Sequence, residues 1–437
     1  MRIFYLLAII LFGFTGLAQA QLYFPPIANE NWETISPDSL GWCPDKVDSL
    51  LTFLDQKNSK SFIVLHKGKI AIEAYFDDYG RDSNWYWASS AKSLVGFMVG
   101  MAQEEGLLNI EDSTSQYLGT GWTDLSPTQE ANIKIRHQLS MSTGLDDGVP
   151  NSNCLLDTCL QYLADPDTRW AYHNAPYRLL QDVLANASGQ SINAFTQQRM
   201  FQRIGMRGLW FNYLRFGRAR DMARFGLLML GKGVWDSDTL LHDQNYFQAM
   251  ISPSQSLNQS YGYLWWLNGQ GSYMLPSLQL QFPTNLIPAA PNDCYAALGK
   301  NDQKIYVVPS MDLVIVRQGD ASGNSVFALS SFDNELWEHL NEVFCSASTP
   351  VEDTFAKSEL SLYPNPTSDL LSIAWERSSS SASTIKLFDT QGKLVMRTSV
   401  PAGQNEISLP VNRLSVGLYL IQIEMNGERV SKRFWKD

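Results

Sequence analysis

The chain has 437 residues, 44% of them hydrophobic and 12% aromatic, enough for one large domain with a small one or for two to three average domains. Acidic residues outnumber basic residues by 44 to 33, giving a formal net charge of −11. This acidic balance argues against nucleic acid and anionic membranes as partners. After residue 20 no stretch of about 18 uninterrupted apolar residues occurs, so we expect no transmembrane span in the mature protein.

The first twenty residues, MRIFYLLAIILFGFTGLAQA, place Arg2 before a short apolar run that ends in Ala18-Gln19-Ala20. This pattern predicts a secretory signal peptide, residues 1–20, and export through the periplasm. Disulfides can persist in such an oxidising compartment. Cys154 and Cys159 are the most plausible pair, and the odd total of five cysteines leaves at least one unpaired. The cysteines and histidines show no metal-binding spacing, so we expect neither a metal nor another cofactor.

Along the chain, residues 46–54 have helical spacing, and residues 61–66 and 69–76 form two strand-like runs around Lys67-Gly68. An apolar helix follows from residue 89, and residues 112–236 have the pattern of helices and loops. We expect strands from Tyr261, over 294–308 and over 311–319, and a closing helix over 325–344. This order predicts an α+β fold: an antiparallel sheet flanked by helices, with a helical insert.

From residue 346 the composition changes to that of a linker, and seven short strand-like runs separated by turns follow. These runs predict a small C-terminal β-sandwich. We expect the first domain to span residues 21–348, the linker 349–357 and the sandwich 358–437.

One pair of residues near the start of the apolar helix suggests chemistry. Ser89 and Lys92 form a Ser-x-x-Lys motif, and on a helix this spacing places both side chains on one face, where an amine can activate a hydroxyl. Ser383 and Lys386 match the same motif but lie in a strand-like run, where residues three apart point to opposite faces. The alternative for Ser89 is a helix cap followed by an ordinary lysine.

A second short motif, Tyr172-x-Asn174, lies in the helical insert. A neighbouring ammonium would lower the pKa of the tyrosine, and burial would lower that of the lysine. A Ser–Lys–Tyr cluster could then move protons at neutral pH without histidine, and no G-x-S-x-G motif occurs in the chain. The alternative for Tyr172 is packing against Trp170.

Together with WASSAKS, HQLSMSTGLDDG, RWAYHNAPYRLL and YGYLWWLN, these motifs resemble the serine β-lactamase and penicillin-binding-protein superfamily. The closest resemblance is to its class C-like esterase and amidase branch, which includes 6-aminohexanoate-dimer hydrolases. The resemblance implies that Ser89 is an acyl-accepting nucleophile and Lys92 the amine that activates it. It also implies that Tyr172 is a general base and acid and that Asn174 orients the lysine and the substrate.

The third motif of this superfamily, Lys-Thr-Gly or His-x-Gly on a strand, falls at Ala297-Leu298-Gly299. Gly299 matches, and the resemblance implies an oxyanion hole made by the backbone N–H groups of Ser89 and Lys300. Ala297 departs from the lysine or histidine that commonly serves substrates with a carboxylate. We therefore expect ester or amide hydrolysis rather than β-lactam or D-Ala-D-Ala hydrolysis.

The C-terminal strands, with LSLYPNP, IKLFDTQGKLV and GLYLIQIEMNGERVSKRF, resemble a type IX secretion sorting domain. This resemblance implies recognition by the type IX secretion machinery and delivery to the outer cell surface or the medium. The alternative is an accessory sandwich that binds a surface or a sugar.

The sequence as a whole therefore predicts a secreted serine hydrolase that acts on a small ester, amide or peptide-like substrate. Two alternatives stay open: a β-lactamase or D-Ala-D-Ala peptidase-like penicillin-binding protein, and a catalytically silent surface binding protein.

Overall fold

The computed structural model describes residues 22–323, 329–345, 360–375, 382–389, 394–425 and 428–437. The predicted signal peptide and the predicted linker lie outside these residues.

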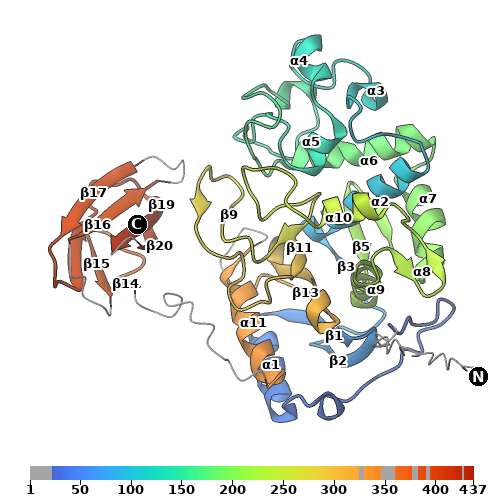
Figure 1. Ribbon diagram of the computed structural model, residues 1–437, viewed down its shortest axis with the longest axis horizontal. Coiled ribbons are helices and arrows are strands. Elements are labelled where there is room, and N and C mark those ends of the chain that lie inside the picture. Colours follow the sequence, from blue (N-terminus) through green and yellow to red (C-terminus); the bar gives the residue numbers. More distant parts are fainter. Residues whose placement is uncertain (1–21, 324–328, 346–359, 376–381, 390–393, 426–427) are drawn as a thin grey trace, which may run out of the picture.

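A six-stranded sheet forms the centre of the first domain, in the order β2-β1-β13-β12-β11-β8 with every neighbouring pair antiparallel (Figure 1). Its strands are β1 (Ser59–His66), β2 (Lys69–Tyr75), β8 (Trp266–Leu267), β11 (Tyr295–Gly299), β12 (Gln303–Val308) and β13 (Leu313–Gly319). The predicted hairpin is β1–β2, whose turn places Gly68 at a φ of 84°, a conformation that favours glycine. The predicted antiparallel sheet flanked by helices is therefore confirmed.

Helices cover both faces of this sheet. On one face lie α1 (Pro44–Gln56) and α11 (Ser331–Val343), where Phe53 stacks on Phe332 at 5.8 Å between ring centroids. On the other face lies α9 (Ala219–Leu230), which packs directly on β12 and β13. Neighbouring residues of β12 show the two faces, because Ile305 lies under α9 whereas Tyr306 contacts Trp337 of α11.

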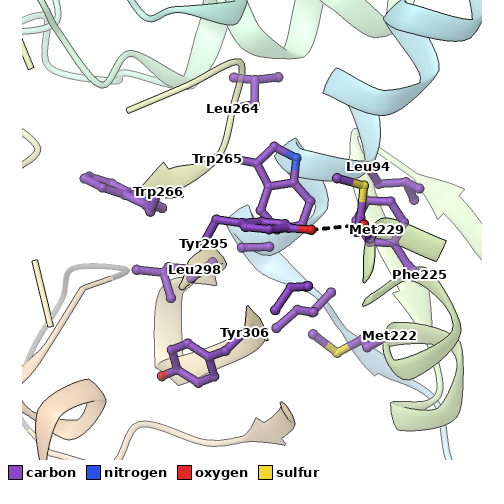
Figure 2. Packing of buried hydrophobic residues seen from close by; sticks show 14 of the residues in the cluster. Leu94, Met222, Phe225, Met229, Leu264, Trp265, Trp266, Tyr295, Leu298 and Tyr306 are labelled. Carbon is purple, nitrogen blue, oxygen red and sulfur yellow. Dashed lines mark hydrogen bonds between the residues drawn. The ribbon is translucent and has the colours of Figure 1, made fainter. Parts of the chain in front are cut away.

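Helix α2 (Ala91–Glu104) is buried along almost its whole length, between the sheet and the helical insert. Figure 2 shows the core beside it, where Trp265 packs against Phe225 of α9 and Tyr295 of β11. The Tyr295 hydroxyl donates a hydrogen bond to the Met229 carbonyl at 3.0 Å, which ties α9 to the sheet. This packing fixes α2 against β11.

The insert above α2 consists of the long helix α6, several short helices and a small antiparallel sheet (Figure 1). Its helices are α3 (Ser115–Leu118), α4 (Pro127–Ala131), α5 (Ile135–Leu139), α6 (Asn174–Ser188), α7 (Ile192–Thr196) and α8 (Gln202–Ile204). The small sheet has the order β3-β5-β4, from β3 (Trp85–Tyr86), β5 (Leu214–Gly217) and β4 (Leu209–Phe211). In the sequence between α9 and β11, five elements accompany β8: β6 (Val234–Trp235), β7 (Asp238–Thr239), α10 (Gln244–Met250), β9 (Tyr273–Met274) and β10 (Gln281–Phe282).

The C-terminal strands form two sheets, in the orders β14-β15-β18 and β17-β16-β19-β20. The strands are β14 (Leu360–Tyr363), β15 (Leu370–Trp375), β16 (Ser383–Phe388), β17 (Leu394–Val400), β18 (Glu406–Pro410), β19 (Gly417–Met425) and β20 (Glu428–Lys436). Apolar side chains of both sheets, among them Ile373 and Ile421, form a buried cluster. The predicted small β-rich domain is confirmed.

Three details differ from the sequence predictions. The strand expected from Tyr261 is reduced to β8, because Leu264 has a φ of 62° and its N–H bonds to the Leu139 carbonyl instead of a neighbouring strand. The closing helix begins at Ser331, where the Ser330 side chain and Asp333 form a capping box. A disulfide joins Cys43 to Cys345, a pair that the sequence did not suggest. The predicted Cys154–Cys159 disulfide is present, and among the described residues Cys294 is the free cysteine.

Candidate active site

Ser89 lies in a tight turn, the 3-10 helix Ala88–Ser90, which leads directly into α2. The Ser90 hydroxyl closes this turn by donating to the Trp87 carbonyl at 2.7 Å. Ala88 adopts a φ of 48°, a left-handed conformation that costs a residue other than glycine about 1–3 kcal/mol. The turn leaves Ser89 partly exposed while Trp87 and Ser90 on either side are buried.

Lys92 lies one turn further along and is 3% exposed. Its Nζ is 2.9 Å from Ser89 Oγ and 2.9 Å from Asn174 Oδ1. The rings of Tyr172 and Tyr177 flank the amine, with centroids 4.7 Å and 4.3 Å from Nζ. The structure thus brings together Ser89, Lys92, Tyr172 and Asn174, the four residues that the motifs singled out.

Helix α6 and the segment before it position the partners of Lys92. Asn174 is the first residue of α6, and Tyr172 precedes it in a tight turn that the His173 N–H closes by donating to the Ala171 carbonyl at 2.7 Å. The Tyr172 ring stacks on Trp266 at 5.7 Å between centroids and makes an edge contact with Tyr261 at 6.1 Å. Tyr172 does lie near Trp170, at 6.4 Å, so the packing role and the site role are compatible.

Burial controls the ionisation of this cluster. Loss of solvent lowers the pKa of Lys92 well below its ordinary value, and the positive charge of Arg178 lowers it further. Burial also raises the pKa of Tyr172, and the Ser89 hydroxyl offsets this only in part. The expectation that the pKa of Tyr172 is lowered is therefore wrong, because the effect of burial outweighs that of the Ser89 hydroxyl. Burial thus favours the neutral forms of both side chains, the amine of Lys92 and the phenol of Tyr172.

The end of β11 lies against the Ser89 turn. A Cβ added to Gly299 would be 2.7 Å from the Trp87 carbonyl oxygen and 2.9 Å from the Ser90 nitrogen, so only glycine fits at this approach. Lys300, the next residue, lines the same cavity as Ser89. Ala297 is fully buried within β11 and is not among the residues that line the cavity.

The cavity has a volume of about 600 Å³ and opens to solvent. Residues from α2, α6, β3, β5 and the turns and loops between the elements line it: Tyr86, Ala88, Ser89, Lys92, Asp147, Val149, Pro150, Ser152, Asn153, Tyr172, Asn174, Tyr177, Arg178, Tyr213, Leu214, Pro276, Ser277 and Lys300. A cavity of this size accommodates a small-molecule substrate.

Sequence reasoning missed Tyr177, Arg178 and Asp147 as parts of this cavity. The first two follow Asn174 by three and four residues, so helical spacing alone could have placed them on the Asn174 face of α6. Asp147 could not have been found in this way, because its position depends on the loop that carries it.

A family model described as Beta-lactamase matches residues 54–317, and a second model, described as Secretion system C-terminal sorting domain, matches residues 361–437. The first match covers more than half of the chain. The chain belongs to the beta-lactamase family. Its fold therefore implies a hydrolase, and the sorting domain implies export by the type IX secretion machinery to the cell surface or beyond.

Several known proteins are similar to this chain in sequence or in fold. An uncharacterized protein of Alkalihalophilus pseudofirmus is 21% identical over 306 residues, which are 60% of this chain and 84% of that protein. A proposed 6-aminohexanoate-dimer hydrolase from Bacillus anthracis has a TM-score of 0.52 at 20% identity, covering 67% of this chain and 82% of its own. A penicillin-binding protein homolog from Caulobacter crescentus has a TM-score of 0.54 at 11% identity, covering 69% and 98%. At these identities the similarity establishes the fold.

No helix in the described ranges is long and apolar enough to cross a membrane. Within the same ranges, no cluster of three or more histidine, cysteine or acidic side chains has the geometry to hold a metal ion.

Proposed function

We propose that this protein is a secreted serine hydrolase that cleaves an ester or amide bond through an acyl-enzyme on Ser89. The observation that carries the proposal is the environment of Lys92, a buried amine 2.9 Å from the Ser89 hydroxyl oxygen inside a substrate-sized cavity. A buried amine with a lowered pKa is a base at neutral pH, and a serine needs such a base to become a nucleophile.

In the proposed reaction, Ser89 Oγ attacks the carbonyl carbon while its proton passes to the Lys92 amine. The backbone N–H groups of Ser89 and Lys300 stabilise the oxyanion. Tyr172 then donates its phenolic proton to the leaving oxygen or nitrogen and recovers a proton from Lys92. Water attacks the acyl-enzyme by the same route in reverse, which releases the acid and regenerates Ser89. Asn174 accepts a hydrogen bond from Lys92 and holds the amine in place.

The first prediction tests the nucleophile. Ser89→Ala should lower hydrolysis of p-nitrophenyl esters by several orders of magnitude and abolish labelling by a fluorophosphonate probe. The thermal midpoint should change only modestly, because Ser89 is partly exposed and the loss of the Lys92 hydrogen bond costs about 0.5–1.5 kcal/mol. Undiminished hydrolysis by a correctly folded Ser89→Ala protein would refute the assignment. A wild type that neither labels nor turns over would favour the silent binding protein.

The β-lactamase or D-Ala-D-Ala peptidase activity is the second candidate, supported by the fold of the family. A panel of short-chain esters, short amides and a cephalosporin, together with fluorescent-penicillin labelling, separates the two candidates. We expect ester hydrolysis to exceed cephalosporin hydrolysis because Ala297 presents no charged group to the cavity. Cephalosporin turnover equal to that of the best ester would reverse the order of the candidates.

A further inference from the structure

The cavity carries positive charge in an acidic protein. Besides the amine of Lys92, three residues with charged side chains line it, namely Asp147, Arg178 and Lys300. Asp147 is the single acid among them, and its carboxylate pairs with Arg169 at 2.6 Å. Within the described part of the chain, neither Arg178 nor Lys300 forms an ion pair. A chain with 44 acidic and 33 basic residues thus leaves two cations without carboxylates at its proposed reaction centre.

Arg178 makes two contacts with the loops beside the cavity. Its guanidinium lies 5.9 Å from the centroid of the Tyr213 ring, and the Asn153 carbonyl is 3.5 Å from one of its terminal nitrogens. The acid nearest along the helix, Asp182, accepts a hydrogen bond from the Tyr213 hydroxyl at 3.0 Å instead. A planar guanidinium held in this way presents donors that match a carboxylate. Lys300, by contrast, is exposed.

The position of Arg178 indicates which part of the substrate it meets. Tyr172, the proposed proton donor to the leaving group, precedes α6, whereas Arg178 lies one turn inside it. Asn174 lies between them and contacts Lys92. Four residues of helix advance about 6 Å. With Tyr172 as the proton donor, we expect the leaving group on the Tyr172 side of Ser89 and the acyl chain on the side of Arg178.

We propose that the substrate carries an anionic group on its acyl chain, a few bonds from the scissile carbonyl, and that Arg178 binds this group. The proposal rests on the proposed function, and it adds the class of acyl group: the half-ester or half-amide of a dicarboxylic acid, or a similarly placed anion. The anionic group would thus be bound by Arg178 of the helical insert and not at position 297 of β11, where the family commonly has lysine or histidine.

The test compares two esters that differ in one charge. Mono-p-nitrophenyl adipate has a free carboxylate at the end of its acyl chain, whereas methyl p-nitrophenyl adipate is its neutral counterpart, and Ser89→Ala supplies the blank. Wild type should hydrolyse the anionic ester with a kcat/KM at least tenfold higher than the neutral one. Arg178→Gln should lower this ratio about tenfold or more, Arg178→Lys should lower it less, and 0.5 M NaCl should reduce the wild-type preference. Because each ratio is taken within one protein, a partly misfolded sample does not distort it.

Two control variants locate the effect. Lys300→Gln, which keeps the backbone N–H, should change the ratio less than threefold, and Arg413→Gln, which removes an exposed charge from the C-terminal domain, should not change it. The proposal is overturned if wild type shows no preference for the anionic ester, if Arg178→Gln keeps the preference, or if Lys300→Gln is the variant that loses it. In each of these cases Ser89-dependent hydrolysis of the neutral ester would still support the proposed function. Absence of that hydrolysis together with absence of labelling would refute both.

Discussion

At the scale of single residues, the ionisation of Lys92 determines what the site can do. Its neighbours are a hydroxyl, an amide oxygen and two aromatic rings, and no carboxylate among the described residues compensates its charge. The free amine therefore follows from burial rather than from a partner. The same burial keeps Tyr172 protonated, so its role is to donate and relay a proton.

Proton transfer between these two side chains gives the second prediction. Lys92→Ala and Tyr172→Phe should each reduce kcat nearly as much as Ser89→Ala, and the double variant should be little worse than either. The reason is that residues acting as one proton-transfer unit have non-additive effects. A double-mutant cycle of kcat/KM measures this coupling. If the two losses simply multiply, Tyr172 acts by packing against Trp266 and not as a partner of Lys92.

The neutral amine also has a cost in stability, which gives the third prediction. Between its lowered native pKa and the unfolded value of about 10.4, the unfolded chain binds a proton that the native chain does not. The free energy of unfolding should therefore rise with pH in this window. Lys92→Met removes the cost, so its Tm should exceed that of wild type at pH 7, and the difference should shrink toward pH 10. Lys46→Met, at an exposed lysine, should follow the wild-type pH dependence. A constant difference across this range would show that Lys92 is not neutral in the native state.

At the scale of elements, the close approach of β11 to the Ser89 turn positions the site. Helix α9 packs equally closely on the central sheet. A Cβ added to Gly226 would be 2.4 Å from Val314 Cγ1 and 3.1 Å from Ile305 Cγ2. Gly226 therefore lets α9 pack closely on β12 and β13.

The fourth prediction concerns this contact. Gly226→Ala should destabilise the protein by about 1–3 kcal/mol through overpacking, although alanine is the better helix former by about 1 kcal/mol. Urea denaturation followed by circular dichroism measures the change. Gly80→Ala is the matched control, because Gly80 has an ordinary φ and nothing within 4 Å of an added Cβ, and it should be nearly neutral. A stabilised Gly226→Ala protein would mean that the sheet yields to the added methyl group.

The sequence predicted correctly those elements that depend on residues close together in the chain. The two strand-like runs around the Lys67-Gly68 turn were enough to predict the β1–β2 hairpin, and three-residue spacing was enough to pair Ser89 with Lys92. The contact between Lys92 and Asn174 could be inferred only through the family resemblance, because 82 residues separate them in the sequence. No local signal pairs Cys43 with Cys345, 302 residues apart. The charge of the cavity was equally hidden, because it depends on Arg169 neutralising Asp147.

At the scale of the whole molecule, two apolar cores support the proposal of two independently folded units, and Leu420 of β19 is the buried residue of the C-terminal strands that packs with the first core. The residues of the proposed site all precede Asn301 and lie over the first core. The C-terminal strands have a core of their own that includes Trp375 and Phe434. The Cys43–Cys345 disulfide closes the first unit just before the predicted linker, and it ties the start of α1 to the end of α11.

The fifth prediction follows from this arrangement. A chain spanning residues 21–348 keeps Cys345 and every residue that lines the cavity, so it should hydrolyse esters with the specific activity of the full-length protein. A chain ending at residue 340 is the control, because it loses Cys345 and the end of α11 and should be less stable, with disulfide loss alone costing about 2–5 kcal/mol. In the native host, the protein lacking residues 349–437 should accumulate in the periplasm as active enzyme, since the sorting domain and not the cavity has been removed. The measurements are specific activity and the distribution of enzyme between periplasm, cell surface and medium. Loss of activity in the 21–348 chain would mean that the C-terminal strands complete the cavity, and unchanged delivery to the surface would mean that they do not act as the sorting signal.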